Sequence, residues 1–168
     1  GLDLDVGTLS ISGTGSGNVI VTEASSLALG AITVGGTFRG TATTGDITDS
    51  GTLTITGAST FNVTVNGSNI ILDSSGNAFA SQVTLQAAAG SGTFGNITFV
   101  DSAAVDLDSS ASADGDLFID GSPDGAVGGN LSVTATTGNI TQNVALAVTG
   151  TSSFTTSASN ATITLSTN

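Results

Sequence analysis

Residues 41–75 read TATTGDITDSGTLTITGASTFNVTVNGSNIILDSS, and residues 134–168 read TATTGNITQNVALAVTGTSSFTTSASNATITLSTN. When the two stretches are aligned without gaps, 14 of 35 positions are identical. The identical positions include apolar residues, such as Phe61 and Phe154, and glycines where turns are expected. A sequence that returns in this way indicates a repeat protein.

The rest of the chain fits the same two-copy frame. The segment NVIVTEASSLAL at residues 18–29 corresponds to NITFVDSAAVDL at residues 96–107, at a smaller offset than the stretches above. The second copy therefore carries about fifteen extra residues, an acidic insertion near residues 108–123. The predicted copies are residues 1–75 and 76–168, within a single solenoid of residues 1–168.

Composition favours short strands and argues against several classes of partner. The chain has 24 Gly, one Pro and 8% charged residues, and branched residues alternate with Thr and Ser, as in LTITG. This period of two is typical of β-strands. The formal net charge is -12 and Arg39 is the single base, whereas phosphate binding needs clustered bases. With no apolar run of membrane-spanning length either, we expect neither nucleic-acid binding nor membrane insertion.

Many short strands are compatible with a β-sandwich or a β-solenoid. A sandwich of this size usually buries a Trp or a corner Tyr, and this chain has neither. A solenoid instead stacks equivalent short strands about 4.8 Å apart around a narrow apolar core. The sequence therefore predicts an all-β solenoid of roughly seven coils.

Alternation within each segment predicts which residues point inward. The expected strands span residues 2–6, 9–12, 19–22, 27–34, 38–43, 52–56, 61–65, 69–72, 83–86, 97–100, 105–107, 117–119, 131–135, 145–149 and 161–165. The expected core residues of the first copy are Ile47, Leu53, Ile55, Phe61, Ile70 and Leu72. Their counterparts in the second copy are Ile140, Leu146, Val148, Phe154, Ile163 and Leu165.

The run TATTGNITQNVALAVTGTSSFTTSASNATITL resembles the repeats of very large bacterial surface exoproteins of the filamentous haemagglutinin type. The resemblance implies a right-handed parallel β-helix that is exported to the cell surface. It also implies a role as a stalk, an adhesin or a filament, with a host or surface receptor that the sequence does not identify. A secretion domain is not recognisable in the chain.

The acidic insertion is the strongest candidate for a binding site. Seven of the thirteen acidic residues lie in residues 101–124, among glycines that bend the chain. Calcium takes six to eight oxygen ligands from carboxylates and carbonyls on such loops. The spacing matches neither an EF-hand loop nor a nonapeptide calcium repeat, so a solvated acidic loop is the alternative. The candidate calcium ligands are Asp106, Asp108, Asp114, Asp116, Asp120 and Asp124.

Two further functions are weaker alternatives. Thr-x-Thr steps would suit an ice-binding hydroxyl array, but threonine is also a common outward residue on strands. These steps are Thr41/Thr43, Thr52/Thr54/Thr56, Thr134/Thr136 and Thr162/Thr164. A polysaccharide-active β-helix enzyme could use paired carboxylates such as Asp106 and Asp108. Because the chain has no His, no Lys and no aromatic sugar platform, we expect no catalytic residues, no enzymatic activity and no cofactor beyond calcium.

The ends of the predicted solenoid suggest a partner. A solenoid end exposes unpaired backbone groups, and a cap is not recognisable at either end of the sequence. Residues 161–165 would then present an edge with which residues 2–12 of another copy can pair. We expect head-to-tail contacts between copies of the chain, made noncovalently or through further sequence.

Overall fold

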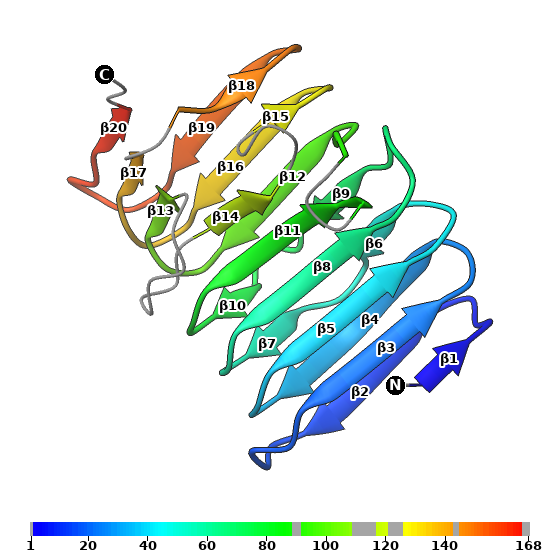
Figure 1. Cartoon of the computed structure of the whole chain (residues 1–168). Helices are drawn as coiled ribbons and strands as arrows, with labels where there is room; N and C mark the ends of the chain where they lie inside the picture. The colour runs from blue at the N-terminus through cyan, green and yellow to red at the C-terminus, as the bar shows by residue number, and fades with distance from the viewer. Residues whose placement is uncertain (1, 89–91, 109–116, 121–125, 143–144, 166–168) are drawn as a thin grey trace.

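The strands of this computed structural model lie side by side along one axis and form a rod (Figure 1). The structure describes residues 2–88, 92–108, 117–120, 126–142 and 145–165. Every element within these ranges is a β-strand, and the paired strands are parallel. The predicted all-β solenoid of about seven turns is confirmed.

Two nine-stranded sheets and one small sheet form the walls of the rod. Sheet A contains, in spatial order, β1 (Leu2–Leu4), β3 (Val19–Glu23), β5 (Phe38–Ala42), β8 (Ser59–Val63), β11 (Val83–Ala87), β14 (Leu117–Asp120), β13 (Val105–Asp108), β17 (Ile140–Gln142) and β20 (Ile163–Leu165). Sheet B contains β10 (Ala78–Phe79), β7 (Leu53–Ile55), β4 (Leu27–Val34), β6 (Ile47–Asp49), β9 (Ile70–Leu72), β12 (Ile97–Asp101), β16 (Leu131–Ala135) and β19 (Ser152–Thr156), and β2 (Leu9–Gly13) also pairs with β4. Sheet C pairs β15 (Ala126–Val127) with β18 (Ala147–Val148).

The core follows from alternation along each strand. In β7, Leu53 and Ile55 are buried while Thr54 between them is exposed, and β6, β9, β11 and β16 also have their least exposed residues at alternate positions. Inward residues of successive turns lie above one another because the register is direct, as in Ile47↔Ile70. An aromatic stack crosses three turns of this core, through the ring pairs Phe38–Phe61, Phe61–Phe79 and Phe79–Phe99.

Five short strands were not predicted from the sequence: β6, β10, β15, β17 and β19. Each lies in a segment with few apolar residues, such as GDITDS around β6, so the period of two is too short to detect. The pairing of neighbouring turns, rather than local propensity, makes these segments strands. In addition, β8 lies two residues earlier than expected, and Val65 is exposed.

The two repeats have the same internal pairing but lie on opposite faces of the rod. The register Phe38↔Ser59 returns 93 residues later as Leu131↔Ser152, yet β5 and β8 belong to sheet A while β16 and β19 belong to sheet B. The strands that follow also change sheets: β6 and β9 of the first repeat are in sheet B, whereas their counterparts β17 and β20 are in sheet A. The second repeat is therefore stacked on the first after about half a turn around the rod axis.

The described part of the acidic insertion, β14, is an additional strand of sheet A. It lies between β11 and β13, with Leu117 opposite both Val83 and Leu107. Leu117 and Ile119 are buried, so this part of the insertion contributes to the core. The chain thus places two successive strands, β13 and β14, in the same sheet.

The predicted core is confirmed for the first copy and only in part for the second. All six residues of the first copy, together with Ile140, are buried. Leu146, Val148 and Phe154 are partly buried against the core, whereas Ile163 and Leu165 are 42% and 44% exposed. The prediction was wrong for these last two residues because no described strand covers the outer edge of β20.

Candidate functional sites: the acidic segment and the open turns

Two of the candidate calcium ligands have side chains in the described part of the chain, and both are hydrogen-bonded. A carboxylate oxygen of Asp106 in β13 accepts a hydrogen bond of 2.7 Å from Thr141 Oγ1. Asp120 in β14 accepts one of 2.7 Å from Gln86 Nε2. Both carboxylates are partly exposed and alternate with buried neighbours, so they face outward from sheet A.

The register separates these two carboxylates. Because Leu107 lies opposite Leu117, Asp106 and Asp120 are four residues out of step along neighbouring strands, or about 13 Å. Asp114, Asp116, Asp124 and the side chain of Asp108 lie outside the described residues. Within the part that is described, no group of three or more acidic, His or Cys side chains is placed to hold a metal ion. The calcium site therefore stays a prediction.

Glu23 and Asp101 are buried acids at equivalent corners of the two repeats. The sequence alone did not identify them as a pair. Asp101 ends β12, and its Oδ1 accepts hydrogen bonds from the backbone N–H of Phe79 and Ala103, at 3.3 and 3.2 Å. Glu23 ends β3, 78 residues earlier, and accepts from the N–H of Val6 and Ser25 in the same manner. Each acid thus connects its own corner to the preceding turn.

The carboxyl of Asp101 is incompletely satisfied. The residue is fully buried, and its Oδ2 has no hydrogen-bond partner. Burial raises the pKa of Asp101 above its ordinary value of 3.8, although backbone N–H groups oppose this shift. Nothing else ionisable is described next to it, so the geometry supports a structural role.

A ladder of polar side chains runs along one edge of the rod. Each of the first five members accepts a hydrogen bond from the backbone N–H of the next member, one turn away, over 2.7 to 3.2 Å. The side chains supply acceptors where the turns leave backbone donors without a strand partner. The ladder therefore ties successive turns together at a corner, and its members are Ser26, Asp46, Asn69, Asn96, Asn130 and Thr151.

The threonines of the possible ice-binding array lie on different faces. Thr41 is in β5 of sheet A, whereas Thr134 in β16 and Thr54 in β7 belong to sheet B. Thr43 lies in a turn, where its hydroxyl donates a hydrogen bond of 2.7 Å to the carbonyl oxygen of Ala24. These residues do not form one flat surface.

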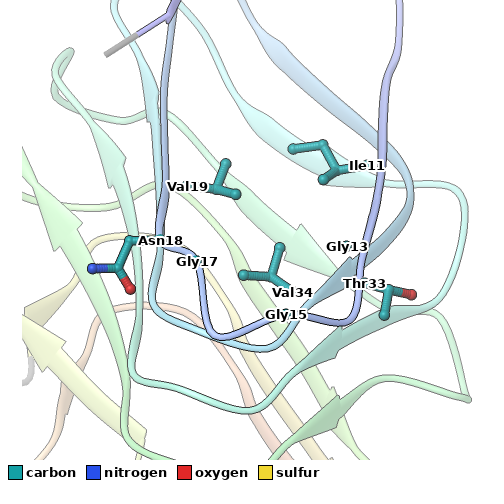
Figure 2. A pocket seen from close by; sticks show the side chains of 8 residues that line it. All are labelled: Ile11, Gly13, Gly15, Gly17, Asn18, Val19, Thr33 and Val34. Carbon is teal, nitrogen blue, oxygen red and sulfur yellow. The ribbon is translucent and has the colours of Figure 1, made fainter.

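A hollow of about 260 Å³ opens between the first turn and the strands beside it (Figure 2). The side chains of Ile11, Val19 and Val34 surround it, and glycines of the loop before β3 form one side. In the second repeat Val127 corresponds to Val34. A single β-bridge pairs Val127 with Phe94, whose side chain is buried. The hollow therefore lies where the second repeat packs a phenylalanine. Its full lining is Ile11, Gly13, Gly15, Gly17, Asn18, Val19, Thr33 and Val34.

The last described turn exposes residues whose counterparts are buried. Ile70 and Leu72 of β9 are covered by β12, whereas Ile163 and Leu165 of β20 have no described strand beyond them. In the same way Phe61 in β8 is covered by β11, whereas its counterpart in β19 is only partly buried. Within the described residues this turn has an uncovered backbone edge and apolar side chains, and it is the candidate site for contact with a further turn or with another copy.

Comparisons with other proteins describe the chain only at the level of its repeats. A family model described as "Repeats of unknown function (DUF5649)" matches residues 16–86 and again residues 94–168. No curated protein and no solved structure gives a significant match. In the described residues there is no helix with the length and apolar character required to cross a membrane.

Proposed function

The chain belongs to this family of repeats, and we propose that it acts as a structural module of an extracellular filament or adhesin stalk, extended by stacking one solenoid end on another. The observation that carries the proposal is the open last turn. Residues at its inner face are buried in the first repeat by the strands that follow, and in the second repeat no described strand covers the same residues.

The side walls of the rod support a structural rather than a catalytic role. Outward positions of sheet B form a column of uncharged, mostly hydroxyl-bearing residues from one turn to the next. Such a surface presents hydroxyl groups to water, and the net charge of -12 of the whole chain opposes lateral association of the rods. The members of this column are Ala28, Thr48, Ile71, Thr98, Ser132 and Ser153.

The location at the cell surface, the adhesin role and the bacterial origin are parts of the same proposal. They are supported by the resemblance of the repeat to bacterial surface exoproteins. Antibodies against the module should label intact source cells, and labelling only after the cells are opened would contradict this location.

A noncovalent contact between ends should be weak. Full burial of an Ile or Leu side chain contributes about 1.5–3 kcal/mol, so covering the exposed two fifths of Ile163 and Leu165 returns roughly 0.6–1.2 kcal/mol each. Backbone hydrogen bonds add about 1 kcal/mol each, while association costs about 4–15 kcal/mol. Copies held in one polypeptide or concentrated on a surface avoid most of this cost.

Sedimentation velocity over a wide range of protein concentration tests the proposal. We expect species that grow by whole copies and become longer without becoming wider. The double variant Ile163→Asp, Leu165→Asp should stay monomeric while keeping its circular dichroism spectrum, because both residues are exposed in the single chain. Thr155→Asp carries a charge on the exposed outward side of β19 and should still associate. A wild-type chain that stays monomeric at millimolar concentration would contradict the proposal.

A further inference from the structure

The junction between the two repeats is a template for the contact between two copies. At this junction β9 pairs with β12 in the register Ile70↔Ile97 and Leu72↔Phe99. The strand β20 is the counterpart of β9, 93 residues later, and it carries the same apolar residues. The strand β3 is the counterpart of β12, 78 residues earlier. The template therefore relates β20 at one end of the chain to β3 near the other end.

We propose that β20 of one copy pairs with β3 of the next copy and takes the place of that copy's own β1. The register transferred from the junction is Ile163↔Val19, Thr164↔Ile20 and Leu165↔Val21. This inference rests on the proposed head-to-tail function and adds to it the strand that is displaced and the residues that meet.

The present position of β1 supports this exchange. Leu2 of β1 lies opposite Val21, which is the place that Leu165 takes in the transferred register. The strand has three residues and, within the described chain, pairs with β3 alone. Within the described chain, β1 is therefore the strand that a second copy would displace to reach β3.

The residues after β1 make the same contacts as the first residues of the second copy. The N–H of Val6 donates to the carboxylate of Glu23 at 3.2 Å, as the N–H of Phe79 donates to Asp101 at 3.3 Å. The N–H of Ala24 donates to the carbonyl oxygen of Leu4, as Ser102 donates to Asn77 at the junction. The first residues of each copy thus hold the corner after β3 or β12 in the same way, so the start of the chain matches the start of the second copy at the junction.

The orientation of the two ends agrees with the exchange. Each repeat is turned by about half a turn relative to the one before it, so two repeats restore the original orientation. Sheet A of one copy therefore meets sheet A of the next, which contains both β20 and β3, and sheet B meets sheet B. In this arrangement β2 would cover Phe154 of β19, as β11 covers Phe61 of β8 in the single chain.

Cysteine cross-linking tests the register, since the chain has no cysteine of its own. Copies with Thr164→Cys are mixed with copies with Ile20→Cys under mild oxidation. Both positions alternate with the inward residues, and adjacent strands are about 4.8 Å apart, within the range of a disulfide. The matched control Arg39→Cys lies opposite Ile20 but one strand further away, about 9.6 Å from Thr164. We expect at least about five-fold more mixed dimer with Ile20→Cys than with Arg39→Cys.

Two further measurements separate strand replacement from simple stacking. Asp5→Cys places a thiol just after β1, and removal of residues 1–7 takes β1 away. The proposal predicts little cross-linking of Thr164→Cys to Asp5→Cys. It also predicts that Thr164→Cys gives more mixed dimer with Ile20→Cys when residues 1–7 have been removed from the Ile20→Cys copy. Preferred cross-linking to Asp5→Cys, or a lower yield after the removal, overturns strand replacement while leaving head-to-tail assembly intact. Absence of every cross-link together with a monomer in sedimentation overturns both.

Discussion

Truncation of Phe61 should destabilise the protein far more than truncation of Phe154, although the two residues are equivalent in the repeat. Phe61 is fully buried, and its ring lies 5.6 Å from that of Phe38 and 6.1 Å from that of Phe79. A Phe→Ala change in such a core costs about 3–5 kcal/mol in free energy of unfolding. The lost ring pairs are part of this cost, at about 0.5–1.5 kcal/mol each.

Phe154 is only partly buried, and the turn in which it lies can open locally without unfolding the rest. Phe154→Ala should therefore cost about 1–2 kcal/mol or less. Urea unfolding followed by circular dichroism measures both changes, provided that the two variants keep the m-value of the wild type. Equal costs for the two variants would refute the claim that stacked turns, and not the local sequence, bury these rings.

Three other predictions concern single sites. Gly57→Ala should destabilise the chain by about 1–3 kcal/mol in urea, because a Cβ would lie 2.6 Å from the backbone of Gly36, whereas Gly7→Ala meets nothing within 4 Å and should be tolerated. Because the pKa of Asp101 is raised, the folded state retains a proton that the unfolded state loses, and the stability from this group falls as pH rises above 3.8. Asp101→Asn should therefore reduce the fall of the urea unfolding midpoint with pH in this range. An unchanged slope would argue against a raised pKa. If the acidic insertion binds calcium, a chelator should lower the melting temperature, and an unchanged melt would favour the solvated-loop alternative.

The class of fold could be predicted because the repeat and the alternation of residues carry most of the information. The offset between Ile47 and Ile140 equals that between Leu53 and Leu146, so the sequence alone locates equivalent turns. Alternation did not identify β6 and β17 as strands, although Ile47 and Ile140 were expected in the core, because each is a single isoleucine among polar residues and only pairing with a neighbouring turn makes a strand.

The half-turn between repeats could not be predicted. A strand with one buried face has the same pattern in sheet A as in sheet B, so alternation does not say which wall it joins. The exposure of Ile163 was missed for a related reason, since burial in a solenoid depends on the next turn and not on the residue itself. The buried acids Glu23 and Asp101 had a detectable signal, since they end β3 and β12, which are equivalent strands of the two copies.

Electron cryomicroscopy of rods formed at high protein concentration tests the central claim most directly. If solenoid ends stack as proposed, the density should show sheet A of one copy continuing into sheet A of the next, with one chain of two repeats as the axial unit. Rods in which sheet A meets sheet B, or copies that associate through their side walls and leave the last turn uncovered, would contradict the account.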